Sequence, residues 1–283
     1  MGYLVLGCVN NNTNSTSPLD RLAHIIGWVT FAVGLPAIGL AIYALKHMAK
    51  GKNGVPFHII SLLVSDIFNF IGRPQVSTQS VISPDMSMLI LYFGVVSNIT
   101  FMVCIAQERH LQTAWPQCQG FFTRVKSTAL FSMVMWAAPF AILALAVLKY
   151  YFWFAVTLLL PFPLLLFFLL DSWRALLCCG PSPMPEMKRT VVALGVILTN
   201  YTLLFLPFVL NILLESLCFL EEVRYLGLVA NMLLYLTPLV DPFLYIFMTK
   251  GPKELVKALS CCRKREMDLP ETISTVSEIV TRL

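Results

Sequence analysis

MSMLILYFGVVSNITFMVCIAQ, the segment from Met86 to Gln107, decides the fold of this chain. Most of its residues are apolar, and it is long enough to cross a lipid bilayer as a single helix. An α-helix rises about 1.5 Å per residue, so about 20 residues cross the roughly 30 Å hydrocarbon core with every backbone hydrogen bond made inside the helix. The segment is therefore expected to be a transmembrane helix.

Further segments of the same kind flank it on both sides. Of all residues in the chain, 58% are hydrophobic and only 12% are charged, and the mean hydropathy is +0.77. This pattern predicts an all-α membrane protein, a seven-transmembrane helix bundle with a short amphipathic eighth helix after the last span. Besides Met86 to Gln107, the expected spans are Ala23 to Leu45, Val55 to Val76, Thr128 to Leu148, Tyr150 to Leu170, Val191 to Leu214 and Leu226 to Met248.

Basic residues indicate the orientation in the membrane. With the N-terminus outside, most of the 20 Lys and Arg residues fall on the cytoplasmic side, as the positive-inside rule requires. The exceptions are Arg21, Arg73, Lys149 and Arg224. The net charge of +5 is therefore a topology signal, and nucleic-acid binding is not expected.

This topology divides the chain into three parts in a multi-pass protein of the plasma membrane. Residues 1–22 are expected to form an extracellular tail, residues 23–248 the seven-helix domain, and residues 249–283 a cytoplasmic amphipathic helix and tail. Sequons at Asn11 and Asn14 predict glycosylation of the outer tail.

Polar motifs inside and at the ends of the spans resemble those of class A, rhodopsin-like G-protein-coupled receptors over essentially the full chain. Each motif alone is weak, but their order and spacing are specific. Phe205 to Phe208 and Asp241 to Tyr245 together are most similar to the branch of nucleotide, proton and bioactive-lipid receptors. The motifs are Leu62 to Asp66, Glu108-Arg109-His110, Pro116, Trp136, Phe205-Leu206-Pro207-Phe208 and Asp241-Pro242-Phe243-Leu244-Tyr245.

The resemblance implies coupling to a heterotrimeric G protein at the inner end of the third span, through Glu108, Arg109, His110 and Pro116. Glu108 would hold Arg109 in the resting state, and release of that charge pair would free Arg109 for the G protein. The alternative is that Arg109 only extends to the interface as the first basic residue of its loop.

The resemblance also implies an activation switch formed by Phe205, Pro207, Asp241, Pro242 and Tyr245. Pro207 removes one helical hydrogen bond and kinks the sixth span, so that its inner end can swing outward when a ligand repacks Phe205. A static kink is the alternative, since such kinks are common in membrane helices.

The resemblance further implies that Asp66, Asn98 and Asp241 converge in the middle of the bundle. Two carboxylates in a low dielectric need a cation, a proton or each other's hydrogen bond to coexist. In the family that the motifs resemble this place holds sodium, so a sodium ion is implied here, with a shared proton as the alternative. No other cofactor and no further metal site are expected.

The ligand pocket is expected among polar residues in the outer halves of the spans. Arg73 would bind a carboxylate or phosphate bidentately, which favours an anionic lipid or a nucleotide-like ligand. The equal alternative is an internal ion pair of Arg73 with Glu215, Glu221 or Glu222. The fourth and fifth spans are joined almost directly at Lys149-Tyr150, which leaves the pocket open. Its expected residues are Arg73, Asn69, Tyr92, Asn211 and Tyr235.

The tails carry further expected sites. Cys8 and Cys218 are the cysteines placed outside, and a disulfide between them is expected, with two free thiols as the alternative. Cys261 and Cys262 follow the amphipathic segment and are expected to be palmitoylated. Thr281-Arg282-Leu283 fits a PDZ-domain ligand, and the Ser and Thr residues of the tail fit phosphorylation and arrestin binding.

The expected function is therefore a receptor that transmits the binding of an extracellular ligand to a G protein, not an enzyme. His24, His47, His58 and His110 are scattered without the i, i+4 spacing of metal hydrolases. A non-signalling or decoy seven-helix receptor is the first alternative. A membrane transporter is the second, although no internal repeat is found.

Overall fold

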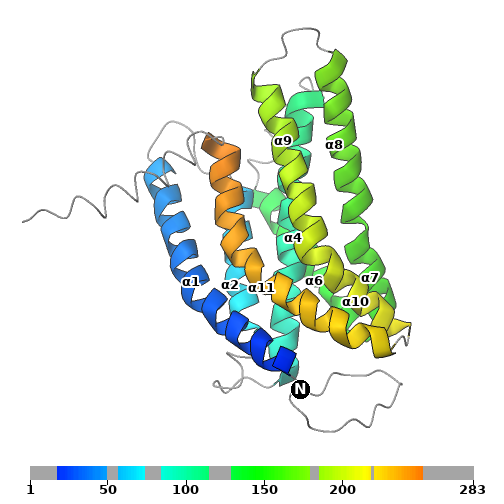
Figure 1. The fold of residues 1–283 in the computed structure, drawn as a ribbon. Helices are drawn as coiled ribbons and strands as arrows, with labels where there is room; N and C mark the ends of the chain where they lie inside the picture. Colours follow the sequence, from blue (N-terminus) through cyan, green and yellow to red (C-terminus); the bar gives the residue numbers. More distant parts are fainter. Residues whose placement is uncertain are drawn as a thin grey trace, which may run out of the picture. The chain divides into compact units, whose positions relative to one another are not determined.

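The described residues are helical apart from a few short turns, and they contain no strand (Figure 1). The computed structural model describes residues 18–49, 57–73, 84–114, 129–178, 185–217 and 220–250. The helices are α1 (Pro18–Ala49), α2 (Phe57–Ile71), α4 (Pro84–Ala114), α6 (Ala129–Val147), α7 (Tyr151–Leu159), α8 (Pro161–Cys178), α9 (Pro185–Asn200), the π-helix η1 (Tyr201–Phe205), α10 (Leu206–Ser216) and α11 (Leu220–Lys250).

The predicted all-α membrane fold is confirmed. Each expected span coincides with one helix or, for the fifth and sixth, with helices that follow one another directly. Three helical stretches are long and apolar enough by themselves to cross a membrane: Asp85–Leu111, Tyr151–Cys178 and Met187–Ser216. Shorter apolar helices correspond to the other spans, at His24–Gly39, His58–Ile71, Met135–Val147 and Tyr225–Asp241. The expected eighth helix lies outside the described residues.

Several helices continue beyond the ends of the expected spans. The fifth was expected to end at Leu170, but α8 continues to Cys178, and α4 continues past Gln107 to Ala114. The hydropathy of a segment reports where the membrane ends, whereas the helical hydrogen-bond ladder continues into the polar interface. Asp171 is consequently a helical residue and not part of a loop.

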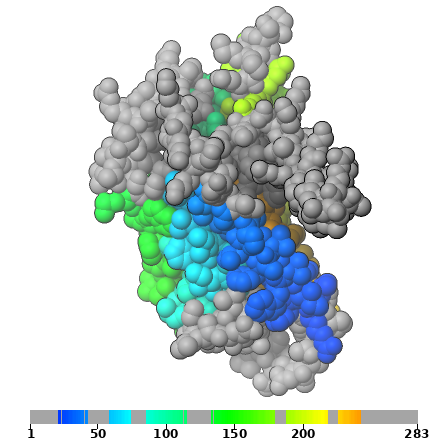
Figure 2. All heavy atoms as spheres, turned by 90° about the vertical axis from the view of Figure 1, so that its left-hand side faces the viewer, coloured from blue at the N-terminus to red at the C-terminus, as the bar shows by residue number. Residues whose placement is uncertain are grey.

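Residues Met1–Tyr245 form one compact unit, to which every contact below belongs. Within it, α4 is the central helix and packs against α2, α6, α8 and α9. Its middle is almost fully buried, with Val95, Val96, Phe101 and Met102 each at 0% exposure. α1 lies against α2, and Figure 2 shows the two side by side on one face of the molecule. A residue in the middle of α4 can therefore contact helices from both halves of the chain.

Two glycines let α2 and α4 approach closely. A Cβ at Gly94 would lie 2.6 Å from Asn69 Oδ1 and 2.7 Å from the Asn69 backbone nitrogen. A Cβ at Gly72 would collide with the backbone of Leu91. Small residues at such positions are the usual way for membrane helices to pack backbone against backbone.

We expect Gly94→Ala to destabilise the protein by about 1–3 kcal/mol, because the added methyl group overpacks a contact that includes backbone atoms. The matched control is Gly39→Ala, since nothing lies within 4 Å of a Cβ placed there. Alanine favours a helix by up to about 1 kcal/mol over glycine, so the control should melt at the same or a higher temperature. Thermal melting of the purified variants in detergent measures both, and equal melting of Gly94→Ala and the parent would contradict the prediction.

The direct connection expected between the fourth and fifth spans is confirmed. α6 ends at Val147 and α7 begins at Tyr151. Lys149 has a φ of 62°, its N–H donates to Ala146 O (3.1 Å), and the Tyr150 N–H donates to Leu145 O (2.8 Å). This is a Schellman cap with a lysine at the left-handed position that glycine normally occupies. The connection is therefore a tight turn that fixes the ends of both helices.

Candidate functional site

Asn98 on α4 joins two buried carboxylates from helices far apart in the sequence. Its side-chain amide donates to Asp66 Oδ1 on α2 and to Asp241 Oδ2 on α11, both at 2.8 Å. All three residues have 0% exposure. The structure thus brings together the three residues for which convergence was expected, and one NH₂ group supplies a hydrogen to each carboxylate.

Asn200, at the end of α9, is a fourth member that the sequence analysis missed. Its amide donates to Asp241 Oδ1 at 3.2 Å, and the residue is 5% exposed. Asn200-Tyr-Thr202 has the form of a glycosylation sequon inside a span, which draws attention away from the residue itself. The signal that finds it is the one that found Asn98: an amide buried in a span needs a polar partner.

Three oxygens of this acidic centre have no hydrogen-bond partner. They are Asp66 Oδ2, Asn98 Oδ1 and Asn200 Oδ1. An oxygen that can only accept is costly to bury unless it receives a proton, a water or a cation. The donor set of carboxylate and amide oxygens suits a hard cation such as sodium, so the residues present fit the ion that the resemblance implies.

The sixth span is interrupted at the expected hinge. The π-helix η1 covers Tyr201–Phe205 and is followed directly by Leu206 and Pro207. Phe205 is fully buried at 0% exposure and stacks on Tyr201 at 6.3 Å. π-Helical turns are rare and occur preferentially at functional sites. Pro242 and Tyr245 lie in α11, but their side chains are outside the described residues.

Tyr201 couples this interruption to the fifth span. Its hydroxyl donates to Leu158 O on α7 at 2.6 Å. Leu158 lies just before Pro161 and Pro163, which lack the N–H groups that a continuous helix would need there. The π-turn of one helix is thus hydrogen-bonded to the other beside its proline break. Sequence analysis missed Tyr201, because nothing in its neighbours distinguishes it from a packing aromatic.

Arg73 does not lie in an open pocket. It is 1% exposed, and its guanidinium donates to Thr30 Oγ1 (2.9 Å) and Gly27 O (3.3 Å) on α1 and to Tyr235 O (2.9 Å) on α11. The guanidinium carbon also lies 4.4 Å from the centre of the Phe70 ring and 4.6 Å from that of Tyr235. Arg73 therefore connects α2 with α1 and α11. Of its guanidinium nitrogens only Nε has no partner, so the bidentate binding of an anionic ligand that was expected of Arg73 has no free pair of N–H groups.

The other expected pocket residues are spread over different contacts. Asn69 is buried against Gly94, Tyr235 accepts from Arg73 through its carbonyl, and Asn211 packs near Gly227. Only Tyr92 of the expected set lines the cavity of about 370 Å³ that the structure contains near the Lys149 turn. That cavity is formed by α4, the turn, α7 and α10 and is lined by Met88, Tyr92, Lys149, Tyr150, Tyr151, Phe152, Trp153, Ile212, Glu215 and Ser216.

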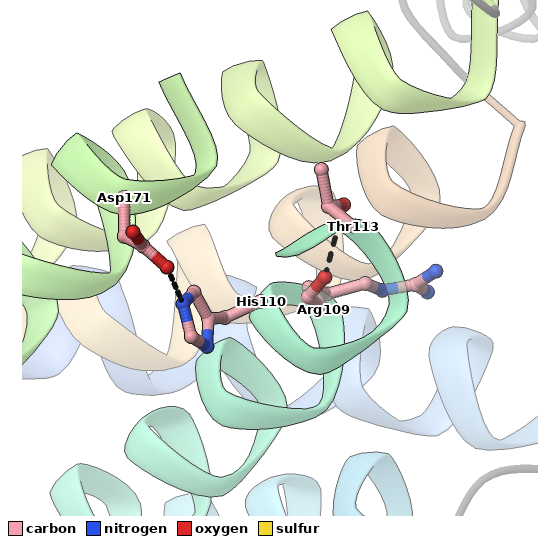
Figure 3. A network of polar contacts seen from close by, with 4 residues as sticks. All are labelled: Arg109, His110, Thr113 and Asp171. Carbon is pink, nitrogen blue, oxygen red and sulfur yellow. Dashed lines mark hydrogen bonds and ion pairs between the residues drawn. The ribbon is translucent and has the colours of Figure 1, made fainter. Parts of the chain in front are cut away.

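At the end of α4 that carries the expected coupling residues, the His110 ring contacts a carboxylate on another helix. His110 Nε2 lies 2.9 Å from Asp171 Oδ2 on α8, and the His110 ring stacks on Phe168 at 4.8 Å. Figure 3 shows the two side chains pointing toward each other, while the Arg109 side chain points away from Asp171. The Thr113 hydroxyl donates to Arg109 O at 3.2 Å. His110 thus holds α8 against α4 and leaves Arg109, half-buried, directed elsewhere.

Several expected sites lie outside the described residues. They are the coupling residue Pro116, the sequons at Asn11 and Asn14, Cys8 and Cys218, Cys261 and Cys262, and the terminal Thr281-Arg282-Leu283.

Comparison with known proteins gives receptors as relatives. No family model matches the chain. The chain is similar to the somatostatin receptor type 5 of Bos taurus, with 29% identity over 114 residues, which are 38% of this chain and 31% of that receptor. It is 24% identical over 140 residues to the G-protein coupled receptor 68 of Mus musculus, covering 44% of this chain and 38% of the relative. With the Homo sapiens protein of the same name the identity is 24% over 141 residues, 45% of this chain and 39% of the relative.

These similarities confirm the resemblance to class A G-protein-coupled receptors that the motifs predicted. The chain matches less than two fifths of the length of each relative.

Proposed function

We propose that the chain is a G-protein-coupled receptor, which transmits the binding of an extracellular ligand to a heterotrimeric G protein. The observation that carries this proposal is the acidic centre, in which Asn98 joins Asp66 and Asp241 across three helices. The sequence similarity to the somatostatin receptor type 5 and to the G-protein coupled receptor 68 is independent support for this proposal.

The arrangement suits a signal that passes along the bundle. η1 and Pro207 interrupt the sixth span, and a helix interrupted in this way changes its angle more easily than a continuous one. Asn200, immediately before η1, is hydrogen-bonded to the acidic centre. A ligand that repacks Phe205 would therefore act on the centre and on the position of the helix end that faces the G protein.

Arg109 is the residue that we assign to the G protein. It lies at the end of α4, beside the His110–Asp171 pair that holds α8 in place. In the resting state Glu108 would hold it, and on activation its guanidinium would be offered to the G protein.

The membrane orientation and the further partners are part of the same proposal. The N-terminus would be extracellular and the C-terminus cytoplasmic, in the plasma membrane. Arrestin would bind the phosphorylated tail, and a PDZ domain would bind Thr281-Arg282-Leu283.

We also propose that the acidic centre binds a sodium ion. Asp66 Oδ2, Asn98 Oδ1 and Asn200 Oδ1 would supply oxygen ligands, since these buried atoms have no other partner. When bound, the ion supplies positive charge between two carboxylates that otherwise repel each other.

The coupling assignment predicts that Arg109→Ala lowers signalling to background while the protein still reaches the cell surface. The measurement uses cells that express dissociation sensors for each G-protein class, both at rest and with a panel of lipids, nucleotides, peptides and amines. The matched control is Arg174→Ala. Arg174 is exposed on α8, three residues after Asp171, so this variant removes the same charge near the same end of the bundle.

A full response from the Arg109→Ala variant would contradict the coupling role. If the surface-expressed parent moves no sensor under any condition, the non-signalling receptor is favoured instead. Uptake of a labelled panel compound into cells, without any sensor response, would favour the transporter.

A further inference from the structure

The cavity beside the Lys149 turn has the size and lining of a small-molecule site. Its volume of about 370 Å³ lies at the lower end of the range for ligand pockets. Tyr92 forms part of its wall and is held by Phe154 at 5.5 Å and Phe208 at 6.0 Å, so its ring position is fixed by packing. The cavity is thus built on rigid helices and closed on one side by the tight turn.

Glu215 on α10 is the negatively charged residue among those that line this cavity. It is half-buried and forms no ion pair with any residue in the described part of the chain. Tyr92 and Tyr151 line the same cavity as Glu215, and Asp85 in the first turn of α4, three residues before the lining residue Met88, adds a second negative charge at this end of the helices. A half-buried carboxylate among aromatic rings lacks the counter-charge that such a group normally has.

The other residues that line the cavity also favour a positively charged ligand. The faces of aromatic rings carry negative potential and attract ammonium groups, so Tyr92 and Tyr151 add to the preference that Glu215 sets. Lys149 is the positive group of the lining, and it is exposed at the turn, where water screens it. Arg73, the other cation considered for ligand binding, is buried elsewhere and engaged by α1 and α11.

The backbone conformation of Lys149 is a further indication of a binding site at this cavity. A lysine with a φ of 62° is strained where glycine would not be. Strained residues are found preferentially at binding sites, where the surrounding structure holds them. Here the strained residue is itself part of the cavity lining.

We propose that this cavity binds an organic cation, a protonated amine with an apolar or aromatic substituent, whose ammonium group is held by Glu215 among Tyr92 and Tyr151. The proposal rests on the receptor function proposed above, because it assigns the chemical class of the ligand. It replaces the anionic ligand that the sequence suggested.

Binding to the purified chain, without a G protein, tests this. The probes are phenethylamine and tryptamine as cations, 2-phenylethanol as a neutral compound of the same shape as phenethylamine, and 3-phenylpropanoate as an anion. We expect at least one of the amines to raise the melting temperature, and the alcohol and the acid to leave it unchanged. Glu215→Gln, which keeps the shape of the side chain, should weaken the affinity for that amine about tenfold or more, since a charge-assisted hydrogen bond is lost.

Two control variants separate the site from general charge effects. Glu186→Gln also removes one negative charge, but at the start of α9, at the opposite end of the run of helices from α9 to α10, and should leave amine binding unchanged. Lys149→Gln removes a positive charge from the edge of the cavity. Because this charge repels the protonated amine, the variant should bind the amine more tightly. The ligand-free melting temperature of each variant shows whether it is folded.

The outcomes distinguish this inference from the proposed function. If the acid binds in place of the amines and Lys149→Gln abolishes its binding, the site takes anions and the inference is overturned. It is equally overturned if none of the probes binds, or if Glu215→Gln binds the amine as the parent does. Amine binding to a protein that moves no G-protein sensor would support the site and contradict the receptor function.

Discussion

Asn98→Ala is expected to destabilise the protein by about 3–5 kcal/mol. Asn98 supplies both hydrogens of its amide to Asp66 and Asp241 at 2.8 Å, and all three residues are fully buried. Removing one partner of a buried charged network leaves uncompensated charge, which costs far more than the network itself contributes. Thermal melting in detergent, together with surface expression in cells, measures the loss.

A second substitution tests the cause. Asp66→Asn in the Asn98→Ala background removes one of the two facing negative charges and introduces an amide that can donate to Asp241. We expect this double variant to recover most of the stability, whereas a mere cavity effect at position 98 would leave it as unstable as the single variant. Melting in sodium chloride is compared with melting in potassium chloride to test the role of the ion. The parent should be more stable in sodium chloride, and Asp66→Asn should melt at the same temperature in both salts.

Arg73→Ala is the other substitution with a large expected effect, a loss of about 3 kcal/mol or more. The side chain is one of the largest that are fully buried, so alanine leaves a cavity. It also removes the hydrogen bonds that connect α2 with Thr30 on α1 and with Tyr235 on α11. Surface expression and melting temperature should both fall.

Two further variants at position 73 distinguish the effect of the side-chain volume from that of the hydrogen bonds to α1 and α11. Arg73→Met fills the space without a donor, and Arg73→Lys keeps the charge without the planar fork that reaches two helices at once. We expect both to remain clearly less stable than the parent. If Arg73→Met melts like the parent, Arg73 only fills volume and does not hold the helices together.

The spans and the acidic centre could be predicted from the sequence because lipid leaves few solutions. A backbone in hydrocarbon must form helices, so the apolar segments locate them. Polar side chains in these segments are rare and costly, which marks them as residues that need a partner. The motifs that resemble class A receptors then implied that Asp66, Asn98 and Asp241 meet in the middle of the bundle.

Partners that depend on the register of two helices could not be predicted. Asp171 lies just beyond the expected fifth span, because the apolar segment ends at Leu170, although the helix continues and brings Asp171 to His110. Arg73 was expected to face a ligand or a carboxylate, but one of its partners is the backbone carbonyl of Tyr235. Every residue carries such a carbonyl, so the sequence gives no sign of which one will accept.

The π-helix η1 at Tyr201–Phe205 sets the rotation of α10 about the axis of the sixth span. One extra residue in a turn rotates everything beyond it by about 100° relative to an uninterrupted helix. Asn200 before the turn faces Asp241, and Ile212 and Glu215 beyond it face the cavity. The π-helical turn thus sets the direction in which the α10 side chains point relative to Asn200. If this segment were an ordinary α-helix, Glu215 would point away from the cavity while Asn200 kept its position.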